Sequence, residues 1–333
     1  MKKIFDIKRT RMIDEAAFGH TPASFGRVFL AFFLVYIISN AASNLVSSFP
    51  LAIYSFFTAM KSGAYDVFKT ALENGNMEEA YAFLDSIITS IPWWAFLLQL
   101  FAYGFMIFAS IFYCKKFEKR TVSSMGLRKN GVGLEIALGL LFGIALIGIN
   151  YLATGIGGAV GYEYNGFNPL ILLFIPAFFV LALGEELLIR GFYMTTLARD
   201  YNPWLCILTS SLIMSLFSLS YASIVGFINT LLLNIMLGIL VFKRGSIWCG
   251  VIIKLVWGFV GANILGTSVF GYTQMLSIFT PVYTSGGTFT TGGEIGFIGG
   301  IFTTLILACM IFILLLTKTK KGEESAVKIE YFV

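Results

Sequence analysis

The chain has 333 residues, of which 57% are hydrophobic and 12% are charged. A soluble globular domain is about half apolar and about a quarter charged, so this composition excludes an ordinary soluble enzyme. The formal net charge of +5 comes from short basic clusters between apolar runs, so we expect no nucleic-acid partner. The composition predicts a multi-span integral membrane protein embedded in a lipid bilayer.

Eight apolar runs are long enough to cross the hydrocarbon layer as helices, because one span needs about 20 residues. They lie at 28–49, 93–114, 133–154, 169–189, 203–222, 224–242, 246–264 and 295–316. None of them alternates apolar with polar residues, as the strands of a membrane barrel do. The sequence therefore predicts an all-α polytopic helical bundle with about eight transmembrane helices.

The positions of lysine and arginine predict the orientation, because basic loops stay on the cytoplasmic side. If the N-terminus is inside, 20 of the 23 basic residues fall in cytoplasmic segments. We therefore expect both termini to be cytoplasmic, with 1–27 as the N-terminal segment and 317–333 as the tail. Residues 11–27 lack the apolar core of a cleavable signal peptide, so the first span is expected to direct membrane insertion.

Two segments are predicted outside the cytoplasm, and both are candidates for contact with a protein partner. In 62–90, apolar residues at helical spacing flank a turn at 73–76, which predicts an amphipathic helical hairpin. The apolar stripe comprises Tyr65, Phe68, Leu72, Met77, Tyr81, Leu84 and Ile88, and the acids on other faces are Glu73, Glu78, Glu79 and Asp85. A solvated linker resting on the membrane is the alternative. Residues 265–294 are rich in Gly, Thr, Ser and Tyr, so we expect an irregular loop that covers the bundle.

Metal and cofactor sites are not expected. His20 is the only histidine, and the four cysteines lie within or at the edges of predicted spans. A zinc site needs Cys and His ligands at characteristic spacing, which this chain lacks. The cysteine positions also disfavour a disulfide framework.

Ionisable residues inside predicted spans mark the candidate site, because a charge in the bilayer centre costs ~2.5–3.5 kcal/mol on insertion scales. Glu186 and Arg190 are one helical turn apart, which permits a local ion pair, while Glu185 needs a partner from another helix. Lys254, within the seventh span, is the expected partner of Glu185 or Glu186. Its long stem reaching the membrane edge is the alternative.

Other polar residues in the spans are interpreted as ordinary interhelical hydrogen-bond formers. They are Asn229, Asn234 and Asn263, with Ser210, Ser211, Ser215 and Ser218.

The residues around the glutamate pair also resemble a known family. Glu185-Glu186-Leu187-Leu188-Ile189-Arg190-Gly191-Phe192, followed by Pro203-Trp204 and Ser210-Ser211, resembles the signature region of the CPBP family, the CAAX-protease and bacteriocin-processing membrane proteins also called Abi. Ser124-Met125-Gly126-Leu127-Arg128 and Gly245-Ser246-Ile247-Trp248 resemble flanking parts of that region. The resemblance implies a CPBP-like core at 115–264, preceded by two transmembrane helices with the hairpin at 28–114 and followed by the loop 265–294 and a last helix.

The resemblance also implies roles for individual residues. Members of this family are intramembrane glutamic endopeptidases, in which the first glutamate activates water and two histidines and an asparagine support the reaction. Glu185 would be that base, with Glu186 and Arg190 as its structural support. The two histidine positions correspond to Ser218 and Lys254, and the asparagine position corresponds to Gly258. An ammonium at Lys254 would weaken the carboxylate that has to accept a proton.

Loss of all three helpers favours a catalytically degenerate CPBP-like protein of a bacterial cytoplasmic membrane. We expect it to act as a scaffold or regulator of a membrane or cell-envelope partner, with bacteriocin immunity as one setting that the resemblance implies. An active endopeptidase that uses Glu185 is the first alternative. A transporter or channel subunit lined by the buried charges is the second.

Overall fold

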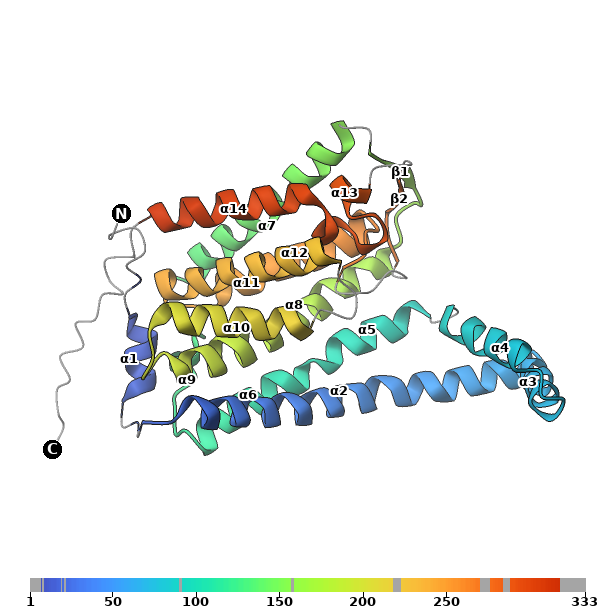
Figure 1. Cartoon of the computed structure of the whole chain (residues 1–333), viewed down its shortest axis with the longest axis horizontal. Helices are drawn as coiled ribbons and strands as arrows, with labels where there is room; N and C mark the ends of the chain where they lie inside the picture. The colour runs from blue at the N-terminus through green and yellow to red at the C-terminus, as the bar shows by residue number, and fades with distance from the viewer. Residues whose placement is uncertain are drawn as a thin grey trace.

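The computed structural model describes residues 7, 9–18, 20, 22–89, 92–156, 159–217, 223–269, 276–283 and 288–317, without the side chains of 84–89. These residues form a bundle of long helices that run side by side, with a small sheet at one end (Figure 1). Helical segments long and apolar enough to span a membrane are 25–61, 93–116, 132–156, 169–197 and 224–244. Shorter apolar helices occupy 203–217, 248–264 and 301–316. The predicted all-α multi-pass membrane bundle is confirmed.

The N-terminal part contains a helix much longer than its predicted span. After α1 (Arg11–Ala17), α2 runs from Phe25 to Lys61, whereas the apolar run predicted a helix over 28–49. At 1.5 Å per residue α2 is roughly 55 Å long, well beyond the ~30 Å hydrocarbon thickness. Its far end carries a hairpin of α3 (Ala64–Glu73) and α4 (Met77–Thr89), which lies past the end of the bundle in Figure 1.

The next two helices pack along α2. They are α5 (Trp93–Ala102) and α6 (Gly104–Lys116), which together form the second span. Ser39, Ser43 and Ser47 form one buried face of α2, and the Ser43 hydroxyl lies 2.7 Å from the Ala102 carbonyl oxygen. Small residues every four positions let two membrane helices approach closely, which explains this contact.

The centre of the bundle is built around α12 (Trp248–Phe259), which packs against α7 (Val132–Ile156) and α8 (Phe174–Glu186). Glycines make the α7 contact close. A Cβ atom at Gly139 would lie 2.6 Å from Ile252 Cβ, and one at Gly143 would lie 2.8 Å from Val256 Cβ. Gly139 and Gly143 form a small-xxx-small pair of the kind that brings membrane helices together.

The remaining helices surround this centre. The 3-10 helix η2 (Pro169–Leu173) leads into α8, which continues as a π-helix η3 (Leu187–Met194) and α9 (Thr195–Leu197). Around them lie η1 (Ser123–Met125), α10 (Pro203–Phe217), α11 (Ile224–Arg244), the π-helix η5 (Val260–Ile264) and α14 (Ile301–Leu316). The predicted last span 295–316 therefore begins later than expected, because the short turns η6 (Gly293–Ile295) and η7 (Phe297–Gly299) precede α14.

The segment 265–294 is not wholly irregular, which corrects the sequence-based prediction. It contains β2 (Phe279–Tyr283) and α13 (Thr288–Thr291), and β2 pairs antiparallel with β1 (Val160–Tyr164). The register runs from Val160 opposite Tyr283 to Tyr164 opposite Phe279. Asn263 ties this segment to the bundle, since its Nδ2 donates to the Leu276 carbonyl at 2.7 Å and its carbonyl accepts from the Ile278 amide at 2.9 Å.

Candidate functional site

The candidate site lies where α8 passes into η3, opposite the middle of α12. Glu185 and Glu186 are the last residues of α8, and Arg190 lies in the π-helix that continues it. Lys254 projects from α12, about 9 Å along the helix from Trp248. The glycine contacts between α12 and α7 therefore hold Lys254 at its position beside α8.

Lys254 pairs with both glutamates, as the sequence predicted. Its Nζ lies 2.9 Å from Glu185 Oε2 and 2.9 Å from Glu186 Oε1. Glu186 Oε1 also accepts from Arg190 Nη1 at 3.1 Å, so the predicted local ion pair is present. The Lys254 side chain is only 4% exposed, which excludes an extended stem reaching the membrane edge. The two acids and two bases sum to zero formal charge, so no charge in this buried group lacks an opposite partner.

Arg190 is anchored by a second helix. It is fully buried, and its Nη2 donates to the Asn234 side chain at 2.7 Å and to the Asn234 carbonyl at 3.0 Å. Glu186 is also fully buried, and a Cβ at Gly250 would lie 3.1 Å from Glu186 Oε2. Helices α8, α11 and α12 thus meet through one network of charge-assisted hydrogen bonds, which holds their relative positions.

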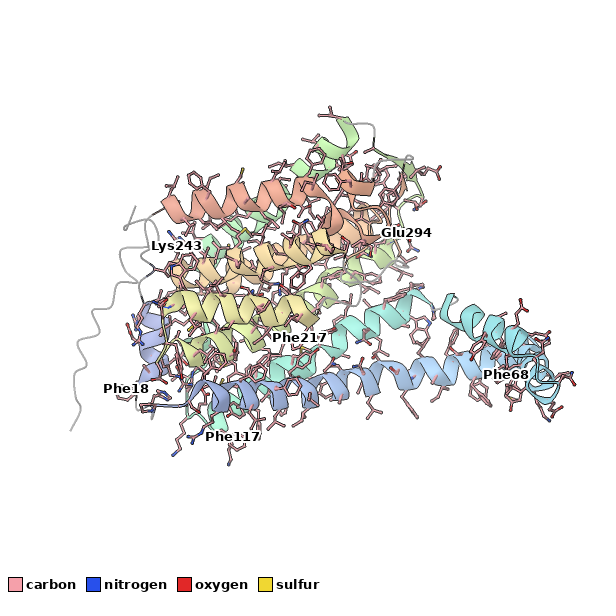
Figure 2. All side chains as sticks on the ribbon, viewed as in Figure 1. Phe18, Phe68, Phe117, Phe217, Lys243 and Glu294 are labelled. Carbon is pink, nitrogen blue, oxygen red and sulfur yellow. The ribbon has the colours of Figure 1, made fainter. Side chains whose placement is uncertain are left out.

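Glu185 differs from Glu186 because it also faces a cavity. Its side chain is 12% exposed and lines a cavity of about 70 Å³. Tyr36 and Asn40 of α2 line the same cavity, together with Phe217 of α10. Tyr36 stacks on Phe217 with ring centroids 4.1 Å apart, and Phe217 lies near the middle of the bundle in Figure 2. Helix α2 therefore covers Glu185, which the sequence did not predict.

The positions that correspond to the family's helpers have different surroundings. Ser218 lies outside the described residues. The Lys254 ammonium is ion-paired with both glutamates. Gly258 faces α8 so closely that a Cβ there would come within 2.4 Å of Phe178 Cδ1. An asparagine at 258 would not fit unless Phe178 moved.

Of the other polar residues in the spans, Asn229 makes the expected contacts between segments, whereas the described serines of α10 do not. Asn229 Nδ2 donates to the carbonyls of Ile298 and Gly300, and Ser210 and Ser215 bond to carbonyls within their own helix. The Ser211 hydroxyl is buried without a hydrogen-bond partner among the described residues. Asn229 thus connects α11 to the segment before α14, whereas the bonds of Ser210 and Ser215 stay within α10.

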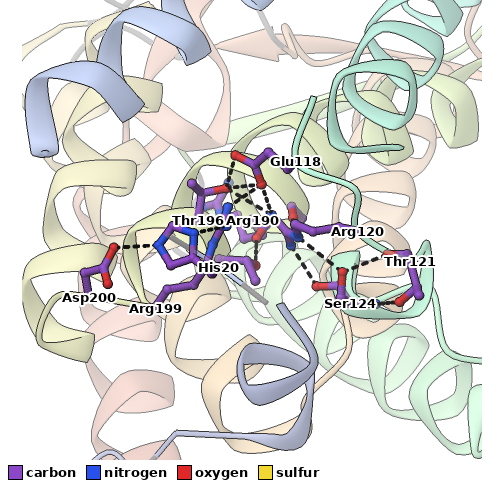
Figure 3. A network of polar contacts seen from close by, with 11 residues as sticks. His20, Glu118, Arg120, Thr121, Ser124, Arg190, Thr196, Arg199 and Asp200 are labelled. Carbon is purple, nitrogen blue, oxygen red and sulfur yellow. Dashed lines mark hydrogen bonds and ion pairs between the residues drawn. The ribbon is translucent and has the colours of Figure 1, made fainter. Parts of the chain in front are cut away.

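A polar network at the end of the bundle that carries α1 was not predicted (Figure 3). Glu118 accepts from Arg120 Nη1 at 3.0 Å, pairs with Arg199, and lies 3.2 Å from the Thr196 hydroxyl. Arg120 Nη2 continues to the Gly191 carbonyl at 3.1 Å, which links this network to η3. In the sequence, the basic residues of this network were interpreted only as indicators of membrane topology. The acidic residue Glu118 among them was the one indication that they form ion pairs.

The single histidine belongs to this network. His20 Nδ1 accepts from Arg199 Nη1 at 2.8 Å, and its Nε2 lies 2.9 Å from Asp200 Oδ2, so the imidazole bridges the two residues. Burial raises the pKa of Asp200, but hydrogen bonds from His20 and the Ala23 amide, with the charge of Arg199, outweigh burial and hold that pKa below its usual value. The residues before α2 are thereby fastened to the residues that follow α9.

Metal binding finds no support in the part of the chain that the structure describes, where no group of three or more His, Cys, Asp or Glu residues could hold an ion. Glu135 of α7 is instead bound by Arg244 at the end of α11, with Oε1 2.5 Å from Nη2. Glu118, Glu135, Glu185 and Glu186 are thus all held in ion pairs with basic residues of the bundle.

The family comparison matches the centre of this site. Residues 167–260 match the family model described as type II CAAX prenyl endopeptidase Rce1-like, and this range includes Glu185, Glu186, Arg190, Lys254 and Gly258. No curated protein and no solved structure matches the chain. Residues 167–260 of this multi-pass membrane protein are therefore similar to the Rce1-like endopeptidases, which supports the resemblance of its sequence to the CPBP family.

Proposed function

We propose that the chain is a catalytically degenerate CPBP protein of a bacterial cytoplasmic membrane, which acts as a scaffold or regulator of a membrane or cell-envelope partner. The observation that carries this proposal is the Lys254 ammonium, 2.9 Å from Glu185 Oε2 and 2.9 Å from Glu186 Oε1. A general base must take a proton from water, and a cation in direct contact stabilises the carboxylate that would have to accept it. The glutamate pair is therefore better suited to joining helices than to activating water.

The space around Glu185 supports the same conclusion. Its cavity of about 70 Å³ can hold a few waters, whereas ligand pockets in proteins are typically ~300–1,000 Å³. Phe178 fills the volume next to Gly258, where the resemblance places an asparagine. A peptide substrate at Glu185 would have to displace α2 residues such as Tyr36.

The partner surface proposed for this scaffold is the hairpin 62–90. The segment 265–294 is proposed to contribute to the same surface. Tyr65, Leu72, Met77 and Tyr81 of the predicted stripe are all exposed. Phe68 belongs to the same stripe but stacks on Phe83 between α3 and α4, with ring centroids 4.7 Å apart. The side chains of Leu84, Asp85 and Ile88 lie outside the described residues. Exposed aromatic and apolar groups on a short hairpin are suited to a protein contact.

An active endopeptidase is the second candidate, and one observation favours it. Glu185 lines a cavity that also receives Tyr36 and Asn40, whose polar groups come from outside the matched domain. A hydroxyl and an amide can both donate hydrogen bonds to a developing oxyanion. In that case α2 would supply the helpers that Ser218, Lys254 and Gly258 no longer provide.

A peptidase assay separates the two candidates. The full-length protein and Glu185→Gln, both in lipid nanodiscs, are incubated with a prenylated peptide ending in a CAAX sequence, and released tripeptide is measured by mass spectrometry. We expect no release above the empty-nanodisc background for either protein. Cleavage by the unaltered protein that Glu185→Gln abolishes at equal folded amount would establish the endopeptidase instead.

A further inference from the structure

A second cavity lies at the cytoplasmic end of the bundle, away from Glu185. It measures about 540 Å³ and is bounded by the start of α2, the end of α6 and the residues after α9. The membrane-spanning segments of α2 and α6 begin at 25 and end at 116, so this cavity lies at the level of the lipid headgroups. Neither the glutamate pair nor the proposed partner surface uses it.

Positive charge dominates this cavity. Arg27, Lys119 and Arg199 line it together with one acid, Glu118. Glu118 is already paired with Arg199 and with Arg120, so its charge is compensated from within the protein. Within the described ranges, Arg27 and Lys119 have no ion-pair partner of their own. The cavity therefore offers two uncompensated cations to a ligand.

The backbone at Lys119 is an independent observation. Lys119 has φ = 52°, and it is the one non-glycine residue with a positive φ in the described part of the chain. Left-handed backbone is unfavourable for a residue with a side chain, and such positions are concentrated at functional sites. In this protein the left-handed residue lines the cavity and directly follows Glu118, which forms ion pairs with Arg120 and Arg199.

Apolar groups stand beside these cations. Phe18 is 73% exposed and Phe117 is 66% exposed, and both line the cavity, as does Tyr113 of α6. A site that combines guanidinium and ammonium groups with aromatic side chains at the membrane surface is suited to an anionic amphiphile. Basic pockets between membrane helices on the cytoplasmic side bind lipid headgroups by this chemistry.

We propose that this cavity binds an anionic phosphate group, with Arg27 and Lys119 as its ligands. The guanidinium of Arg27 matches two phosphate oxygens, and the Lys119 ammonium adds a point charge. The phosphate is supplied either by the headgroup of an anionic phospholipid, whose chains contact Phe18 and Phe117, or by a free phosphate ester.

Native mass spectrometry of the full-length protein in detergent tests this proposal. The probes are phosphatidylglycerol, phosphatidylcholine of the same chain length, and free glycerol 3-phosphate. The test variant is Arg27→Ala with Lys119→Gly, where glycine accepts the positive φ without strain. The matched control is Lys115→Ala with Lys116→Ala, which removes two exposed charges at the end of α6 that do not line the cavity.

We expect phosphatidylglycerol to bind more tightly than phosphatidylcholine, and we expect the test variant to weaken it about tenfold or more, while the control changes it about twofold or less. Weak binding of glycerol 3-phosphate then identifies the lipid as the source of the phosphate. Equally tight, variant-sensitive binding of glycerol 3-phosphate identifies a free phosphate ester. Equal losses in test variant and control, or no preference for either anion over phosphatidylcholine, would overturn the proposal.

Discussion

Lys254 is held by two carboxylates in a nearly dry environment, so the energetic consequences of its loss are large. Lys254→Met leaves Glu185 and Glu186 with a single cation, Arg190. Removing one member of a buried ion network typically costs ~3–5 kcal/mol of folding free energy. We expect Lys254→Met to lower the amount of folded protein in membranes and its melting temperature in detergent, with the exposed Lys115→Met as the control.

Glu185→Gln should behave differently if Glu185 acts structurally. The amide keeps an acceptor of the same shape for Lys254, so we expect a loss of about 1 kcal/mol. Folded protein level and any partner co-purification should stay close to those of the unaltered chain. Abolished function at unchanged protein level would argue for a catalytic carboxylate.

The bridge between His20 and Asp200 predicts a pH dependence. Because the folded-state pKa of Asp200 is lowered, the contribution of its carboxylate to stability is complete above the unfolded-state value and is lost as pH falls through the folded-state value. We expect the melting temperature of the unaltered protein to fall more steeply below about pH 4 than that of Asp200→Asn. Asp66→Asn, on the exposed face of α3, should leave the steep fall in place.

Residue-level prediction from sequence succeeded where one physical rule was enough. A charge within a span is costly without a counter-charge, so the position of Lys254 in the seventh span favoured its pairing with the glutamates over a stem that reaches the membrane edge. The network around Glu118 did not follow, because His20, Glu118 and Arg199 are far apart in the chain and charges in loops need no partner. Phe178 leaves no room for a side chain at position 258. This close contact depends on the distance between α12 and α8, which the periodicity of the sequence does not define.

At the scale of elements, the contact between α7 and α12 is the most sensitive to added volume. Gly139→Ala or Gly143→Ala places a methyl within 3 Å of Ile252 or Val256 side-chain atoms next to the backbone. Overpacking of this kind typically costs ~1–3 kcal/mol. Gly148→Ala is the matched control on the same helix, since nothing lies within 4 Å of its Cβ position. Melting temperatures in detergent should fall for the first two variants and not for the third.

The α3–α4 hairpin is predicted to bind the partner but not to hold the bundle together. Replacing 62–90 with a short Gly/Ser linker should preserve membrane insertion, because the hairpin's contacts with the rest of the chain are mainly with the end of α2. Partner recovery after cross-linking in membranes should be lost. Recovery at the level of the unaltered chain would place the binding surface on the lipid-facing helices.

The positions of the helices were predictable because apolar runs mark the segments that lie in the membrane. The ends of the helices and the pairing of the strands were not predictable. Pro50 and the serines before it interrupt the apolar run of α2, yet the helix continues to Lys61. The pairing of β1 with β2 joins segments more than 100 residues apart, and neither segment alternates strongly enough to reveal a strand. Whether such a segment forms a strand depends on its tertiary contacts.

For the molecule as a whole, the orientation is the property that a labelling experiment checks best. Figure 1 places α1 at one end of the bundle, and α3, α4 and the small sheet at the other. In a Cys309→Ala background, where the other cysteines are buried, Glu78→Cys should react with a membrane-impermeant maleimide in intact cells. Phe117→Cys should react only after permeabilisation. The reverse pattern would invert the predicted topology.

The neutral sum of the four buried charges has an electrical consequence. Moving one elementary charge through 100 mV involves ~2.3 kcal/mol, which is how voltage-sensing helices do work. Glu185, Glu186, Arg190 and Lys254 are linked by direct contacts, so they would shift together and transfer no net charge across the field. We therefore expect the membrane potential to exert no net force on the summed charge of this centre, because its formal charges cancel.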